Sequence, residues 1–418
     1  MKKNGFTLVE ITVCVVLLVT IFLIVVPKVN TMINNKKKNA YNSLISTVKD
    51  AAQAYVYLNV NIVDDAIESQ GYYEVSIRTL QENELLENKL ENPLTGKNIP
   101  STSIVKIIKN NEEYIYKFSL DYQYLLEHII DLYSSEETRI SNGLKKDNTP
   151  DQNIRYYGSN PNNYVSFNNE LWRIIGVFGN NVKLVRSEKL GDLSWDSSES
   201  SVNGGYGVNE WSQADLQNYL NKMYYGGTSV TCYNGKSNKT TTCPTNTIDE
   251  TAKTLIDNHI WNTGAIEYNT RTDTVAFYKD ERGNQTGKIC SSGNNCNDTV
   301  ERTTTWTGYI GLPYPTDYAY ASGENICETN MVKQDSSDAY ICENNNWMFK
   351  SIWYWTLSPF ARSANSRYVW YVNGDGDVNN SNAASGGAVF PAIYLKSNVL
   401  IESGAGTSSN PYILKAGS

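Results

Sequence analysis

The sequence contains very little histidine, with two residues in 418. It also lacks the H-E-x-x-H, G-x-S-x-G and phosphate-loop patterns, which excludes the usual zinc peptidase, α/β-hydrolase and P-loop sites. No catalytic pattern surrounds His128 or His259, and the S-x-x-K match at Ser103–Lys106 falls in a segment that reads as a strand. We therefore expect neither enzymatic activity nor a cofactor.

Positive charge is scarce after the first 38 residues. The chain has 36 Lys and Arg against 44 Asp and Glu, a net charge of −8. Six lysines against Glu10 give the first 38 residues a charge of +5, which leaves −13 for the remainder. Nucleic-acid binding needs clustered Lys and Arg, so we expect no direct nucleic-acid binding. The 30 tyrosines are typical of extracellular recognition surfaces, although a biased genome composition would also produce them.

The cysteines are few but follow a pattern. Cys14 lies in an apolar run, and the other six form three pairs that are close in sequence. There is no C-x-x-C and no nearby histidine, which argues against zinc. Close pairs in polar, turn-rich segments favour disulfides formed outside the cytoplasm. The candidate disulfides are Cys232–Cys243, Cys290–Cys296 and Cys327–Cys342.

One long hydrophobic run stands at the N-terminus. Residues Phe6 to Val26 contain a single charge, Glu10. At ~1.5 Å per residue the run spans about 30 Å, which predicts a transmembrane helix. A secretory signal peptide would have a shorter apolar region with the small residue after it, whereas Gly5 precedes this run.

The segment Gly5-Phe6-Thr7-Leu8-Val9-Glu10 resembles the type IV prepilin signal. The resemblance implies a prepilin peptidase that cuts between Gly5 and Phe6, N-methylation of Phe6, and a kink at Pro27. It also implies other pilin or pseudopilin subunits and membrane lipid as partners. A carboxylate within such a run normally has a partner, and the terminal amine of a neighbouring Phe6 suits Glu10. A Glu10 that merely reaches the headgroups is the alternative.

The same resemblance implies a location. The prepilin peptidase acts on the cytoplasmic side, so we expect a single-pass protein of the cytoplasmic membrane, N-in and C-out. The protein would then stand extracytoplasmically in a pilus or pseudopilus on the cell surface.

A small head is predicted after the apolar run. Residues 40–57 have apolar positions at three- and four-residue steps, which predicts an amphipathic helix. Residues 103–108 and 113–118 read as two strands of a hairpin. The block is similar to the small sheet of type II secretion pseudopilins and Gram-positive competence pilins. Residues 121–135 read as another helix, and the Asn-, Asp-, Gly- and Pro-rich residues 142–161 read as a linker.

The C-terminal part reads as a second domain. It begins with strands at 164–178, around Asn168-Asn169, and 181–186, followed by a helix at 209–225 with Ser212 as its N-cap. Residues 226–345 show little regular pattern, and we expect surface loops held by disulfides. Residues 353–359 and 386–395 resemble a bacterial surface domain related to the C-type lectin-like fold, although Phe390 stands where an Arg is common.

A calcium loop is a weak further candidate. Asn373, Asp375, Asp377 and Asn379 provide oxygen ligands at alternate positions. Position 384 is alanine where such a loop needs glutamate, and Asn-Gly and Asp-Gly also signal a plain hairpin turn.

These observations predict an α+β chain with a long N-terminal transmembrane helix. The first function that fits is a minor, tip-located pilus or pseudopilus subunit, which displays a domain that binds a surface, a glycan or a protein. The second is a pseudopilin of a type II secretion or DNA-uptake machine. The third is a membrane-tethered enzyme, which the motifs do not favour. The predicted organisation is a leader (1–5), a transmembrane helix (6–26), its extracytoplasmic continuation (27–60), a pilin-like head (61–135), a linker (136–160) and a C-type-lectin-like domain with disulfide-stapled loops (161–418).

Overall fold

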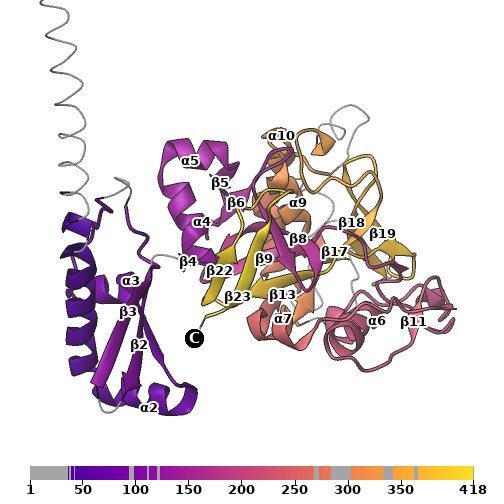
Figure 1. Cartoon of the computed structure of the whole chain (residues 1–418). Coiled ribbons are helices and arrows are strands. Elements are labelled where there is room, and N and C mark those ends of the chain that lie inside the picture. Colours follow the sequence, from indigo (N-terminus) through magenta and orange to yellow (C-terminus); the bar gives the residue numbers. More distant parts are fainter. Residues whose placement is uncertain are drawn as a thin grey trace, which may run out of the picture. The chain divides into compact units, whose positions relative to one another are not determined.

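The computed structural model divides the chain into two compact units (Figure 1). The first unit ends at Gln123, and the second runs from Tyr124 to Gly417. The described residues are 36, 39–41, 43–93, 98–110, 113–119, 123–267, 273–283, 303–332, 342–361 and 366–417.

The structure does not bear out the predicted membrane helix. Within the described residues, no helix is both long and apolar enough to cross a membrane. Residues 6–26, on which the prediction rested, lie outside them. The described helical residues 43–58 include exposed side chains, such as Tyr57 and Leu58. The fold of the described residues is corrected to a mixed α+β architecture in which no helix could cross a membrane, and the single-pass, N-in and C-out location is withdrawn.

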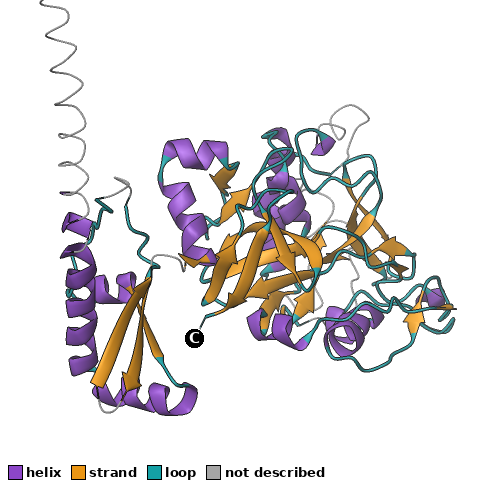
Figure 2. Ribbon diagram, in the orientation of Figure 1, coloured by secondary structure: helices purple, strands orange, loops and turns teal. Residues whose placement is uncertain are grey.

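The first unit packs a helix against a small sheet (Figure 2). The helix over residues 43–58 buries Val48, Ala52 and Tyr55, as its three- and four-residue spacing predicts. The sheet is antiparallel, in the order β1-β2-β3. Its predicted hairpin is confirmed, since β2 and β3 pair from Ile104↔Ser119 to Asn110↔Glu113. The other elements are α2 (Val60–Gln70), β1 (Tyr73–Ser76), α3 (Ile77–Glu82), β2 (Ile104–Asn110) and β3 (Glu113–Ser119).

The second unit contains two larger sheets. One follows the order β16-β21-β9-β8-β7-β23-β22-β4, and β6 pairs with both β8 and β5 beside this order. The other follows β10-β20-β17-β18-β19, with β14 paired to β17. The strands are β4 (Gln123–Tyr124), β5 (Leu144–Lys146), β6 (Ile154–Tyr156), β7 (Tyr164–Phe167), β8 (Glu170–Phe178), β9 (Asn181–Arg186), β10 (Asp192–Leu193), β11 (Cys232–Tyr233), β12 (Thr240–Thr241), β13 (His259–Asn262), β14 (Ile266–Glu267), β15 (Thr305–Gly308), β16 (Ile310–Gly311), β17 (Tyr354–Ala361), β18 (Tyr368–Val372), β19 (Val378–Asn382), β20 (Gly387–Ala388), β21 (Ala392–Leu395), β22 (Val399–Ser403) and β23 (Tyr412–Ala416).

The helices of this unit are short. Their small size leaves much of the unit to strands and loops, as Figure 2 shows. They are α4 (Leu125–Ser134), α5 (Glu136–Ser141), the 3₁₀ turns η1 (Asn203–Gly205) and η2 (Trp211–Gln213), α6 (Asp215–Asn218), the π-helix η3 (Tyr219–Tyr225), α7 (Glu250–Leu255), α8 (Thr274–Glu281), α9 (Pro315–Ala321) and α10 (Ile326–Thr329).

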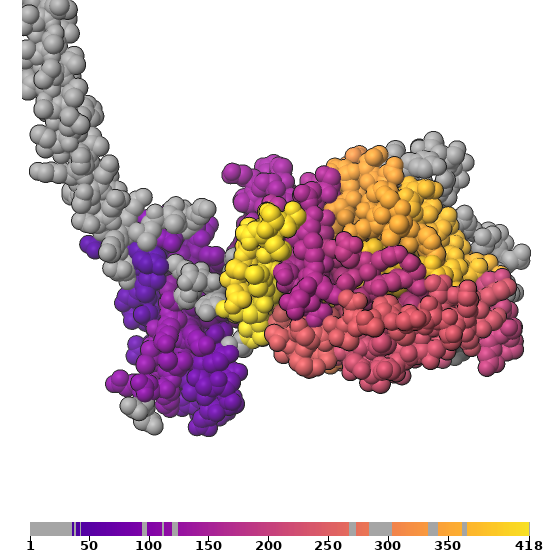
Figure 3. All heavy atoms as spheres, turned by 45° about the vertical axis from the view of Figure 1, so that its right-hand side comes forward, coloured from indigo at the N-terminus to yellow at the C-terminus, as the bar shows by residue number. Residues whose placement is uncertain are grey.

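Segments that are distant in sequence complete the larger sheet. The predicted hairpin of β7 and β8 forms around Asn168 and Asn169, whose φ angles of 56° and 57° suit a tight turn. Strand β23 pairs in parallel with β7 on its other side. In Figure 3 the yellow atoms of the C-terminal residues lie on the surface beside magenta atoms.

The predicted boundary between head and linker is wrong. Residues 124–160 belong to the second unit. Leu125 and Ile129 of α4 are fully buried in its core, and β6 pairs with both β5 and β8. Several polar residues that resembled a linker are buried instead. Asn153 is 6% exposed and Arg155 is 1% exposed.

Two expectations for the middle of the second unit are also corrected. The described part of the stretch 226–345 does not consist of surface loops alone, because every residue of α9 is buried and Trp261 and Phe277 lie in the core. The expected helix over 209–225 is divided into η2, α6 and η3. Its first turn is capped by Glu210, whose side chain accepts hydrogen bonds from the backbone of Ser212 and Gln213.

Candidate functional site

The predicted processing and assembly residues cannot be placed. They lie outside the described residues, and their roles remain predictions. They are Gly5, Phe6, Glu10 and Pro27.

Two disulfides join segments of the second unit. One connects β11 to the segment after β12, and the other connects α10 to the segment before β17. In both, the Cα atoms are 5.3 Å apart, a usual separation for the bond. The bonds are Cys232–Cys243 and Cys327–Cys342, two of the three pairs expected from spacing, while Cys290 and Cys296 lie outside the described residues.

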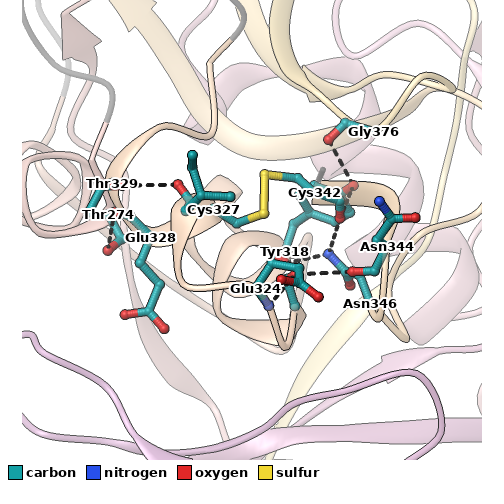
Figure 4. Close-up of a disulfide and its surroundings, with 12 residues drawn as sticks. Thr274, Tyr318, Glu324, Cys327, Glu328, Thr329, Cys342, Asn344, Asn346 and Gly376 are labelled. Carbon is teal, nitrogen blue, oxygen red and sulfur yellow. Dashed lines mark hydrogen bonds between the residues drawn. A yellow bond between two sulfur atoms is a disulfide. The ribbon is translucent and has the colours of Figure 1, made fainter. Parts of the chain in front are cut away.

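The second disulfide is embedded in a hydrogen-bond network (Figure 4). The Tyr318 hydroxyl lies 3.0 Å from the Cys342 carbonyl oxygen and 2.9 Å from that of Gly376. The Asn346 amide donates to the carbonyls of Tyr318 and Cys342. The disulfide therefore joins the Cys342 segment to α10, and these hydrogen bonds connect the same segment to helix α9 and to the turn between β18 and β19.

That turn contains the calcium candidates. It is a hairpin turn in which the backbone N–H of Asn373 donates to the Asp377 carbonyl, at 2.7 Å. The Asn373 side-chain amide donates to the carboxylates of Asp375 and Asp377, at 3.4 and 2.9 Å. Within the described part of the chain, no group of three or more His, Cys, Asp or Glu is placed to hold a metal. Calcium binding here remains a prediction.

The two histidines are part of the packing of the second unit. His128 Nε2 lies 2.9 Å from the Tyr412 hydroxyl, and burial lowers the pKa of His128 to about 4. His259 stacks on Tyr394 with ring centroids 3.7 Å apart, and burial lowers its pKa despite a hydrogen bond to Asp257. Neither arrangement presents a nucleophile to a base.

A small pocket in the second unit gathers three cationic side chains. Arg173 of β8 and Arg186 of β9 meet Lys350, which precedes β17. The free space amounts to about 10 Å³, roughly the room of one water molecule. The remaining lining consists of Ser187 and of apolar and aromatic residues: Val185, Trp347, Met348, Tyr354 and Phe390.

Arg173 is held rigidly but without an acid. Its side chain is 6% exposed, and its guanidinium lies over the rings of Tyr164 and Trp347 at 3.9 and 4.7 Å. Its Nε donates to the Asn163 side-chain oxygen at 2.7 Å, and Nη2 donates to the Pro161 carbonyl at 3.3 Å. Burial lowers the pKa of Arg173 to about 10, so the group stays charged at neutral pH.

Lys350 and Ser187 complete the polar part of the pocket. Lys350 Nζ donates to the Ser187 carbonyl at 3.1 Å. Burial, and then the charge of Arg173, lower the pKa of Lys350. The Ser187 side chain is buried, and its Oγ has no hydrogen-bond partner among the described residues. The site therefore has both cationic charge and an unused hydroxyl.

Other buried cations of the second unit have carboxylate partners. Arg155 contacts Asp147 at 2.9 Å and Asp317 at 2.6 Å, and Lys183 contacts Asp317 at 2.5 Å. Burial opposes ionisation of Asp317, but Lys183 and Arg155 hold its pKa below the usual range. Among the described residues, neither Arg173 nor Lys350 forms such an ion pair.

Arg186 lines the pocket, but like Arg155 and Lys183 it has a carboxylate partner. Its Nε and Nη2 donate to both carboxylate oxygens of Glu170, at 2.9 and 3.0 Å. The backbone carbonyl of Glu188 accepts a hydrogen bond from Arg186 Nη1. The Glu188 side chain is exposed, but its negative charge still raises the pKa of Lys350. Counting these two acids, the three cations leave an excess of one positive charge at the pocket.

A local sequence signal marks Arg173, but the site was not predicted from that signal. The residue interrupts a strand in which residues 172–177 are all buried. A charged residue in a strand buried on both faces needs a partner or a function. Lys350 and Ser187 come from distant segments, and no local pattern marks them.

Comparisons with known proteins give no relatives. No family model, no curated protein sequence and no solved structure matches this chain. The pilin-like and lectin-like resemblances are therefore untested by comparison.

Proposed function

We propose that this chain is a type IV pilin-like subunit that carries a large binding domain. The observation that carries the proposal is the order of features: a prepilin-type motif, then a helix packed on a three-stranded antiparallel sheet, then a separate second unit. The first unit would serve assembly with other pilin or pseudopilin subunits. The second unit, which holds the cationic pocket, would contact a partner.

The size of the second unit favours a minor subunit. It extends from Tyr124 to Gly417, more than twice the length of the first unit. A domain of this bulk on every subunit would crowd a repeating filament, so a place at the tip suits it. Antibody labelling restricted to filament tips is the expected result, and uniform labelling along the filaments would contradict the placement.

Processing and assembly provide the direct test. The mature protein is expected to begin at an N-methylated Phe6, which N-terminal sequencing and mass spectrometry measure. Replacing Glu10 with Ala removes the carboxylate that would pair with the ammonium of a neighbouring Phe6. The variant should be cleaved normally but should enter filaments at least tenfold less often, by immunoblotting of sheared filaments.

A matched control is Glu82→Ala, which removes an exposed carboxylate at the end of α3. This variant should assemble normally. A mature chain that begins at Met1, or a Glu10→Ala variant that assembles as well as the control, would defeat the proposal.

A further inference from the structure

We propose that the cationic pocket, defined by Arg173, Ser187, Lys350 and their aromatic neighbours, binds a carboxylate at the end of a short flexible stem. The glutamate side chain of a protein partner carries such a group. The inference deepens the proposed function and rests on it only for the binding role of the second unit.

Unused hydrogen-bond donors support a ligand with acceptor atoms. Arg173 has five N–H donors, of which its two contacts use two. Lys350 has three, of which one reaches the Ser187 carbonyl. The Ser187 hydroxyl has no partner among the described residues. Buried polar groups are almost always satisfied, so an acceptor-rich group is expected here.

The excess positive charge favours an anion as this group. Elsewhere in the second unit, buried cations face carboxylates directly, as Lys183 faces Asp317. Arg173 and Lys350 instead come close enough for the charge of Arg173 to disfavour protonation of Lys350. An incoming carboxylate would replace the missing partner and would accept charge-assisted hydrogen bonds from both.

The size of the pocket distinguishes between anions. Free space of about 10 Å³ takes roughly one oxygen-sized group, so a flat carboxylate on a slender stem fits the pocket mouth better than a tetrahedral sulfate or phosphate. A uronic acid carries its carboxylate directly on a ring, and the walls leave no room for that ring. Trp347, Tyr354 and Phe390 are at most 4% exposed, so they serve as walls for a methylene stem, not as an open stacking platform.

The test uses the purified full chain and small probes. N-acetyl-glutamate amide carries one carboxylate on a two-carbon stem, and N-acetyl-glutamine amide is its neutral counterpart. Calorimetric titration should show binding of the first at millimolar concentration and at least tenfold weaker binding of the second. Sulfate and glucuronate, tested alone and as competitors, should bind at least tenfold more weakly than the glutamate probe.

Variants locate the binding in the pocket. Lys350→Met keeps the stem but removes the charge, and it should weaken binding about tenfold or more. Ser187→Ala should weaken it about threefold, since it removes one hydroxyl donor. Lys189→Met is the matched control, because Lys189 is exposed and pairs with Asp192 at 2.7 Å. It should bind like the unaltered chain.

Several outcomes would overturn the proposal. Equal binding of the neutral probe would show that charge is not recognised, and equal or tighter binding of sulfate or glucuronate would show the wrong anion class. Unchanged affinity in both Lys350→Met and Ser187→Ala would place any binding elsewhere. The Glu10→Ala chain should bind the probe normally, so failure of filament assembly and failure of the pocket are separate results.

Discussion

Buried charges in the second unit fall into two kinds at the residue scale. Lys183, Arg155 and Asp317 form contacts of 2.5 and 2.6 Å at almost no exposure. Such networks cost desolvation free energy, and removing one member leaves an uncompensated charge, so their geometry specifies the arrangement of the strands. Arg173 has neutral oxygens, rings and other cations around it but no carboxylate partner among the described residues. The paired charges of Lys183, Arg155 and Asp317 organise the core, whereas the charge of Arg173 is the one that we propose to meet a ligand.

His128 should make the protein sensitive to mild acid. Burial lowers its pKa to about 4 in the folded state, against about 6.5 in the unfolded state. Between these values the unfolded chain binds the proton more tightly. The stability from His128 is therefore full above pH 6.5 and is lost as the pH falls toward 4. For this partly buried group we expect a loss of about 1–3 kcal/mol.

The measurement is the free energy of unfolding of the full chain in urea between pH 7 and pH 4. The variant His128→Gln keeps a hydrogen-bond partner for Tyr412 but does not titrate. The difference in stability between the two proteins should change steadily across this interval. A difference independent of pH would show that His128 is protonated equally in both states.

At the scale of elements, the turn between β7 and β8 places Arg173 in register with Tyr164. Asn169 in that turn has a φ of 57°, a left-handed conformation that side chains branched at Cβ rarely adopt. Asn169→Val should therefore lower the free energy of unfolding by about 1–2 kcal/mol. Asn169→Gly, which loses the same amide but accepts this φ, should stay within about 0.5 kcal/mol of the unaltered chain.

Urea unfolding at constant pH measures both variants. If the valine and glycine variants lost equal stability, the Asn169 side chain would matter through its contacts. The backbone conformation would then not be the cause.

The local pattern of apolar and turn residues in the sequence predicted the two hairpins of this fold correctly. The β2–β3 pair and the β7–β8 pair depend on alternating apolar residues and on turn residues such as Asn168, all of which lie close together in sequence. The same reasoning failed for residues 136–160, because Asn153 and Arg155 look like linker residues until Asp147 and Asp317 surround them. Partners 162 residues apart, as Arg155 and Asp317 are, leave no local signal.

The candidate site was missed for a related reason. Arg173 lies in a strand that the sequence predicted correctly, but its lack of an acidic partner is visible only in three dimensions. Lys350 and Ser187 approach it from segments 163 residues apart. Sequence reasoning therefore placed the strand but not the charge balance around it.

At the scale of the whole molecule, both described disulfides belong to the second unit. Reduction should therefore lower the unfolding temperature of that unit and leave the first unit unchanged. A crosslink that closes a loop of about 15 residues, as Cys327–Cys342 does, contributes about 3 kcal/mol. Differential scanning calorimetry of the full chain should show two transitions, of which reductant shifts one.

The double variant Cys327→Ser with Cys342→Ser should reproduce part of that shift without reductant. A reductant effect on both transitions, or on neither, would contradict the assignment of crosslinks to one of two separable units.

The parallel pairing of β23 with β7 has a consequence for biosynthesis. About 245 residues separate the end of β7 from the start of β23. At roughly 5–20 residues per second, a ribosome needs on the order of 12–50 s to translate that interval. Throughout it, one edge of β7 has no neighbour, whereas the first unit already has its whole sheet. A nascent chain therefore passes through a prolonged stage with an open β-edge, when chaperone protection matters most.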